Sequence, residues 1–250
     1  MPVQCKGIEA CIYSGSTELK PEGVSTNADH TESTCWIASE VGKAQLSQEF
    51  SLRWQRSRKL GKGTFSGRVE VDGEQCGGLI MERTVPRDHW FIKSGLETSQ
   101  DTIRSFNFAK VELTDDDALL DASQNIGEIC FSVWRVQILE TNNEYRSSHE
   151  ERKVHERSKK LTTHRVKLGE EVETEPTKSS VVEIIGDAPL VKITFKYRPR
   201  ELLVAEGIIG SSEEAKPAAQ RNINPQAGPS NVKREASEPA PARQVHKTGS

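Results

Sequence analysis

The sequence is poor in apolar side chains and contains no long hydrophobic run. Hydrophobic residues make up 34% of the 250 residues and aromatic residues only 6%, whereas charged residues reach 28%. This composition, in a chain long enough to bury a core, predicts an ordered body joined to a polar segment that does not pack. No apolar run is long enough to span a bilayer, and Met1–Lys6 lacks the start of a secretory signal. We therefore expect an intracellular protein, cytoplasmic or nuclear, that enters no membrane.

The cysteines and histidines form no pattern typical of a disulfide framework or a metal site. The five cysteines are widely separated and never arranged as Cys-x-x-Cys, so we expect reduced, buried thiols. The six histidines include no pair four residues apart, the spacing of zinc-binding helices. The chain also lacks the Gly-x-Ser-x-Gly motif of serine hydrolases and a complete phosphate-binding loop. We expect no cofactor, although dispersed catalytic residues keep an enzyme open.

Short β-branched and aromatic runs, separated by turn signals, fill most of the chain. Phe50–Trp54 alternates with period two, which places its three apolar side chains on one face. Asp72-Gly73 is a strong hairpin signal. The run Ile126–Leu139 has apolar residues on both faces, which indicates a strand buried between two layers. The other predicted strands are Ile8–Tyr13, Thr34–Ala38, Gly67–Val71, Gly77–Met81, Trp90–Lys93, Phe106–Leu113 and Val191–Tyr197.

The spacing of these strands predicts the fold class. Many short strands at intervals of about ten residues are typical of a mostly β, antiparallel β-sandwich-like domain. Jelly-roll and immunoglobulin-like topologies both remain open. Thr114 is suited to cap one short helix, and Pro199–Gly207 predicts another, with proline in its first turn and glycine as its stop.

The character of the chain changes at residue 211. Aromatic residues vanish, and Ser, Glu, Ala and Pro dominate the remaining sequence. Such a segment buries too little apolar area to offset its chain entropy. We therefore expect one β-rich domain over residues 1–210 and a disordered tail over residues 211–250.

The most basic stretch of this near-neutral chain, whose net charge is −3, is residues 152–165, the basic segment. Its cationic side chains are suited to bind phosphates or an acidic partner. The alternative is a solvated loop balanced by the acidic pairs Glu150–Glu151 and Glu170–Glu171. No aromatic residue interleaves with it, which weakens the case for single-stranded nucleic acid. The candidate contact residues are Arg152, Lys153, His155, Arg157, Lys159, Lys160, His164 and Arg165.

Two short motifs are typical of proteins that interact with the modifier SUMO. Val232–Glu235 has the apolar-Lys-x-Glu form of an acceptor site and lies in the predicted tail, so we predict modification of Lys233. If Lys233→Arg left the ladder of conjugates in cells unchanged, this prediction would be wrong. Val181–Ile185 has the composition of a SUMO-interacting strand, and an ordinary strand of the domain explains it equally well.

Several segments, taken in order, resemble a known family. They are Thr34–Ile37, Val71–Gly73, Glu112–Leu120, Ile126–Ile129, Val133–Val136, Val154–Lys160 and Phe195–Leu203. Together they resemble a domain-of-unknown-function family expanded in basidiomycete fungi, over essentially residues 1–210. The resemblance implies a single fungal domain and brings no activity, ligand or catalytic residue with it. It includes Val154–Lys160 among its segments, which favours a role for the basic segment.

The sequence predicts a non-enzymatic interaction module that binds a protein or an acidic partner through the basic segment. Nucleic acid is a less well supported partner, for the reason given above. The alternative is an enzyme or small-ligand binder with a pocket between the sheets. A large, closed, apolar-lined cavity would favour this alternative, and an exposed basic face would favour the interaction module.

Overall fold

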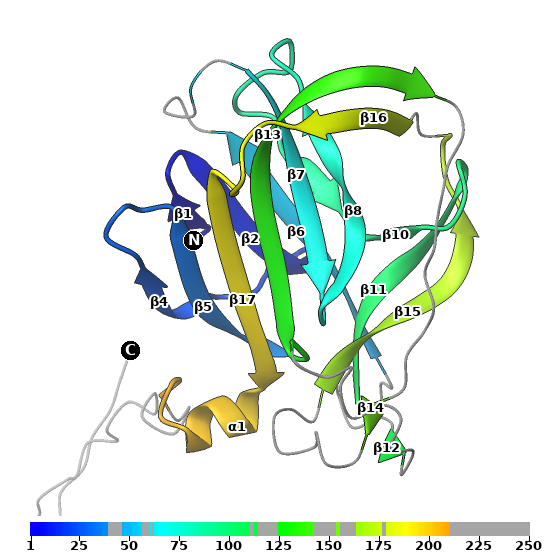
Figure 1. Cartoon of the computed structure of the whole chain (residues 1–250). Coiled ribbons are helices and arrows are strands. Elements are labelled where there is room, and N and C mark those ends of the chain that lie inside the picture. Colours follow the sequence, from blue (N-terminus) through cyan, green and yellow to red (C-terminus); the bar gives the residue numbers. More distant parts are fainter. Residues whose placement is uncertain are drawn as a thin grey trace, which may run out of the picture. The chain divides into compact units, whose positions relative to one another are not determined.

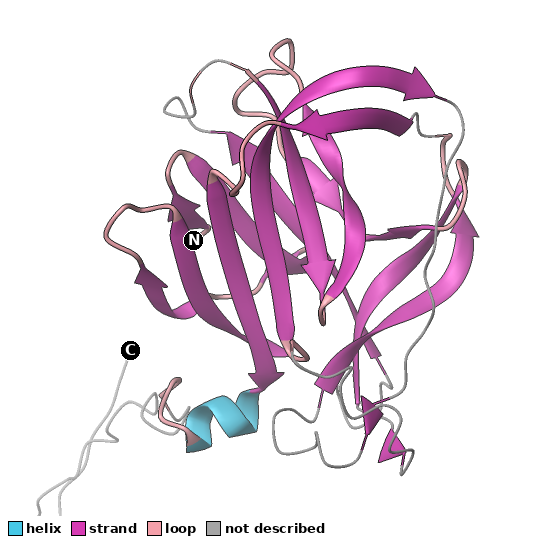
Figure 2. Cartoon of the chain, in the orientation of Figure 1, coloured by secondary structure: helices cyan, strands magenta, loops and turns pink. Residues whose placement is uncertain are grey.

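Strands dominate the computed structural model of this chain, and one short helix follows the last strand (Figure 2). The structure describes residues 1–39, 47–56, 61, 63–110, 113–114, 125–142, 154–155, 164–176 and 179–210. The first strands are β1 (Val3–Cys5), β2 (Ile8–Ser14), β3 (Thr17–Glu18), β4 (Glu22–Thr26), β5 (Glu32–Ser39), β6 (Ser47–Arg56), β7 (Thr64–Val71), β8 (Glu74–Met81) and β9 (Phe91–Lys93). The later elements are β10 (Gly95–Glu97), β11 (Thr102–Lys110), β12 (Leu113–Thr114), β13 (Glu128–Asn142), β14 (Val154–His155), β15 (His164–Glu173), β16 (Ser179–Ile184), β17 (Val191–Pro199) and α1 (Arg200–Ala205).

These strands form two large sheets that face each other (Figure 1). The eight-stranded sheet has the order β1-β2-β6-β11-β10, with β3 on β2, β9 on β6 and β15 on β11. The seven-stranded sheet has the order β4-β5-β17-β13-β7-β8, with β16 on β13. Its β5–β17 pairing is parallel, as is the short β12–β14 pair, and the other pairings are antiparallel. The predicted mostly β, sandwich-like fold is confirmed, and its seven-stranded sheet is mixed.

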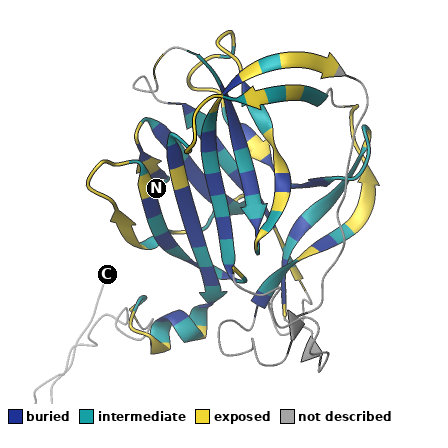
Figure 3. Cartoon of the chain, in the orientation of Figure 1, coloured by how far each residue is buried: buried dark blue, intermediate teal, exposed yellow. Residues whose placement is uncertain are grey.

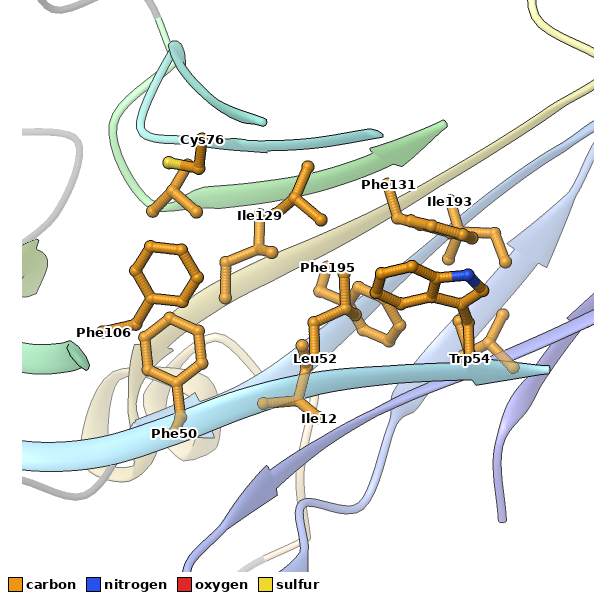
Figure 4. Close-up of a cluster of buried hydrophobic side chains, with 14 of the residues drawn as sticks. Ile12, Phe50, Leu52, Trp54, Cys76, Phe106, Ile129, Phe131, Ile193 and Phe195 are labelled. Carbon is orange, nitrogen blue, oxygen red and sulfur yellow. The ribbon is translucent and has the colours of Figure 1, made fainter. Parts of the chain in front are cut away.

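The core lies between the two sheets and is filled by aromatic side chains (Figure 4). The predicted inward face of β6 is confirmed, since Phe50, Leu52 and Trp54 are at most 1% exposed. The Trp54 ring lies 4.8 Å from the ring of Phe131 on β13, centroid to centroid. Each such side chain contributes roughly 1.5–3 kcal/mol by leaving water. The two layers are therefore held together by direct ring contacts across the middle of the sandwich.

The strand β13 is fully buried along one face from Ile129 to Val133, and the predicted burial of its other face holds only in part, since Val136 is 3% exposed whereas Cys130 is half-buried. Ile129, Phe131 and Val133 are fully buried. Trp134 points to the other face, where it is half-buried and donates from Nε1 to the Ser132 hydroxyl at 3.1 Å. That face is the outside of the sandwich, and Figure 3 shows buried and partly buried residues alternating along its strands. Apolar residues on both faces of this strand therefore indicated full burial of one face and partial burial of the other.

The predicted helix after β17 is confirmed as α1. Leu203 is the buried residue of α1. Gly207 follows the helix with a φ of +71°, in the left-handed region that glycine tolerates. Thr114 lies in β12, and the helix predicted to follow it falls on residues outside the described ranges, as does the predicted tail. The compact unit of the chain extends from Met1 to Ser211. Among the described residues, no helix has the length and apolar character needed to cross a membrane.

Candidate interaction surfaces

The last part of the basic segment enters β15 through a buried histidine. His164 is only 6% exposed, and its Nδ1 is hydrogen-bonded to the Ser39 hydroxyl at 2.8 Å. Ser39 ends β5, whereas His164 begins β15, so this bond connects the two sheets. Burial lowers the pKa of His164 below its ordinary value, which favours the neutral ring. His164 thus fixes the end of the basic segment and is not a surface cation.

A partly buried group of hydrogen bonds fixes the same strand two residues later. The Val166 amide donates to Asp72 Oδ2 at 2.8 Å, and the Gly127 amide donates to Asp72 Oδ1 at 2.9 Å. The Tyr197 hydroxyl donates to the same carboxylate at 2.6 and 2.8 Å. Burial raises the pKa of Asp72 to about 6, although these hydrogen bonds act in the opposite direction. The Asp72 carboxylate therefore joins the β7–β8 turn to the starts of β13 and β15 and to β17.

The structure places three of the eight candidate residues of the basic segment. His155 lies in β14, where it pairs in register with Thr114 of β12. Arg165 follows His164 in β15 and is half-buried, in register with Ala109 of β11. The others lie outside the described residues, as does Lys233, and the segment stays a prediction as a contact surface. They are Arg152, Lys153, Arg157, Lys159 and Lys160.

A further group of cations lies on the outer face of the seven-stranded sheet, close to α1. The Arg198 guanidinium stacks 4.9 Å from the centre of the Trp36 ring, and the Lys196 ammonium lies 5.7 Å from it. Arg198 pairs with Ala38, one position before Ser39 in β5. Sequence reasoning did not identify this group, because Trp36 and Arg198 are brought together only by the β5–β17 pairing. Both cations are paired, since the Lys196 ammonium lies 3.3 Å from the Glu128 carboxylate and Arg198 pairs with Glu206. The same end of the sandwich thus carries the fixed end of the basic segment and two cations that carboxylates neutralise.

The described interior offers little space for a ligand between the sheets, because ring contacts fill it. A cavity of about 590 Å³ instead lies open to solvent between the β2–β3 hairpin, the end of β5 and the start of α1. Three of its four charged lining residues are paired, since Lys20 pairs with Glu22 at 2.7 Å and Glu18 pairs with the nearby Met1 amine at 2.9 Å; the fourth is Arg200. Ligand pockets are usually enclosed and mainly apolar, with a few convergent polar groups. This groove is therefore a weak candidate for a small-molecule site.

The thiols are poorly suited to nucleophilic chemistry. All five cysteines are free, and burial raises the pKa of Cys11, Cys35 and Cys76 to about 12. A thiol with so high a pKa forms almost no thiolate near neutral pH. Within the described ranges, no group of three or more histidine, cysteine, aspartate and glutamate side chains is arranged to hold a metal ion.

Comparison with known proteins gives one match. No curated protein and no solved structure matches the chain significantly. One family model does match, over residues 2–212, and its description is domain of unknown function DUF7918.

Proposed function

We propose that this chain, which belongs to the DUF7918 family, is a non-enzymatic interaction module that binds an acidic protein partner through the basic segment. The proposal places it in the cytoplasm or nucleus of a fungal cell, in line with the basidiomycete resemblance of its segments. The observation that carries the proposal is the fixed end of the segment. His164 and Val166 hold the start of β15 to both sheets, the first through a buried hydrogen bond and the second through a partly buried one.

A rigid base favours binding because an attachment point that is already fixed loses no conformational entropy when a partner binds. Lys196 and Arg198 lie near the same end of the sandwich, but Glu128 and Glu206 pair with them, which leaves the basic segment as the source of positive charge. Cations that gather on one side attract an acidic partner and raise its association rate, and this effect weakens with salt. The proposed contact therefore depends on charge and is sensitive to ionic strength.

The alternative, a pocket between the sheets, has less support. Trp54 and Phe131 occupy the space that such a pocket would need, and the described groove lies at the sandwich margin. The interaction module is therefore the function that the geometry supports best.

Charge reversal tests the proposal on the full chain, with a poly-glutamate peptide as the probe. We expect Arg157→Glu, Lys159→Glu and Lys160→Glu together to weaken binding at least about tenfold at low salt, with a smaller difference at high salt. The matched control reverses three exposed cations elsewhere: Lys6, Arg83 and Arg87. It makes the same change in net charge and should keep most of the affinity.

Two outcomes would overturn this function. If the first triple variant bound the peptide as the wild type does, the basic segment would not be the contact. If a duplex oligonucleotide bound more tightly than the peptide, with the same loss on reversal, the partner would be nucleic acid and not protein.

A further inference from the structure

The strands β13 and β16 form a two-stranded arm that continues beyond the rest of the seven-stranded sheet (Figure 1). β16 pairs with the second half of β13. The ladder begins where Val136 faces Ile184 and ends where Asn142 faces Ser179. β17 and β7 pair with the first half of β13. Among the residues that the structure describes, no strand pairs with the other edge of β16.

The backbone of β16 presents hydrogen-bonding groups at this free edge. The Ile185 amide donates to the Arg135 carbonyl at 2.9 Å, so Ile185 directs its backbone groups towards β13. In an antiparallel ladder the direction alternates from residue to residue. Val182 and Ile184 therefore direct their amides and carbonyls away from β13. Such an unpaired row is a template on which another strand can pair.

The arm also exposes apolar side chains. Val181 is 48% exposed, Ile185 is 47% exposed, and Leu139 on β13 is 58% exposed. Two of the seven large apolar residues that are most exposed in the described chain thus lie on these two strands, and a third, Ile185, follows β16 directly. Figure 3 shows exposed positions along both strands. Edge strands normally carry charged residues or proline to prevent pairing. Exposed apolar residues on a free edge indicate an interaction site.

The charges around β16 are mainly acidic. Glu183 lies between Val181 and Ile185 on the exposed face, and Glu140 pairs in register with Val181. Asp187 follows β16 and is exposed as well. A strand with basic side chains fits this edge by charge, whereas two copies of the arm would bring like charges together.

We propose that the free edge of β16 pairs with the edge strand of a partner protein bearing basic side chains, and that this partner is a SUMO-type modifier. The run Val181–Ile185 has the apolar-apolar-x-apolar form of a SUMO-interacting strand, and its first four residues already lie in the extended strand β16. Strand addition of this kind gains affinity from main-chain bonds and specificity from the alternating side chains. The site is separate from the basic segment and does not rest on the function proposed above.

The test is a titration of SUMO, isotope-labelled for NMR, with the full chain. We expect the wild type to shift SUMO resonances, and Val181→Thr with Ile185→Thr to bind at least about tenfold more weakly. Threonine keeps the strand propensity, and both positions are exposed, so the fold is preserved. The matched control is Val172→Thr on β15, which is 54% exposed and should bind as the wild type does.

A charge variant gives an independent measure. Glu183→Lys should weaken binding, most strongly at low salt, whereas Glu173→Lys on β15 should not. The proposal fails if the wild type leaves SUMO resonances unshifted, or if Val172→Thr loses as much affinity as the double variant. Self-association that the double variant abolishes, without SUMO binding, would assign the edge to a second copy and would equally overturn it.

Discussion

At the scale of single residues, the Asp72 carboxylate is subject to two opposing effects. Hydrogen bonds from Tyr197, Val166 and Gly127 favour the charged form, and burial disfavours it. Burial has the larger effect, and the pKa rises to about 6 from the ordinary value of 3.8. The folded state therefore binds this proton more tightly than the unfolded state does.

This shift predicts how stability depends on pH. The stabilising contribution of Asp72 is complete below its unfolded pKa of 3.8 and is lost as the pH rises through about 6. We expect the free energy of unfolding of the wild type, minus that of Asp72→Asn, to decrease between about pH 4 and pH 6. Urea denaturation of both proteins at several pH values measures it, and the other titrating groups cancel in the difference. Parallel pH curves across this window would contradict the assignment.

The sequence predicts the turn in which Asp72 lies but not the groups that bond to its carboxylate. Asp72-Gly73 was predicted as a hairpin turn, and the turn is present between β7 and β8. The groups that bond to the carboxylate lie 55, 94 and 125 positions away in the chain, where no local pattern reports them. The same holds for His164, which was predicted as a surface cation. Its partner Ser39 is also 125 positions away.

At the scale of elements, strands with a strong apolar alternation were predictable and charged strands were not. β2, β5, β6 and β17 were all predicted from their side-chain pattern, and each contributes buried residues to the core. β15 carries charges at most positions and was interpreted in part as the end of a basic loop. It forms a strand because β11 pairs with it along its length and because Leu168 is buried against the core.

One glycine determines how closely β6 and β7 approach. A Cβ atom at Gly67 would lie 2.9 Å from the Trp54 ring and 3.0 Å from the Phe131 ring. We expect Gly67→Ala to lower the free energy of unfolding by about 1–3 kcal/mol, because the rings must shift in a filled core. Gly210→Ala is the control, since its Cβ would meet nothing within 4 Å. Urea denaturation measures the free energy of unfolding of both variants. A Gly67→Ala variant as stable as the control would show that the space between the two sheets accommodates an added methyl group.

At the scale of the whole molecule, the sequence predicted the sandwich but not its strand order. The spacing of strands and turns is a local property and is sufficient for the fold class. The parallel pairing of β5 with β17 joins segments far apart in the chain, and neither strand carries a signal for it. The cations beside Trp36 escaped prediction for the same reason.

The distribution of thiols gives a measure of the intact fold. Four of the five cysteines are buried, and Cys130 is half-buried. We expect a disulfide reagent to modify Cys130 first in the native protein and to react with all five thiols at once in denaturant. Cys130→Ser should remove the fastest native phase, which a spectrophotometric thiol assay detects. Immediate modification of several thiols without denaturant would show that the core opens readily.

The position of β17 has a consequence for synthesis on the ribosome. It lies between β5 and β13 and is the last strand of the domain to emerge. Until then the nascent seven-stranded sheet consists of two parts, β4-β5 and β13-β7-β8 with β16 on β13, and each part has an open inner edge. At ordinary translation rates this interval lasts on the order of ten seconds, long enough for chaperones to bind the open edges. A truncated mRNA that ends before the codons of β17 therefore yields a polypeptide in which both edges stay exposed. Cellular quality control can distinguish this polypeptide from one that contains β17.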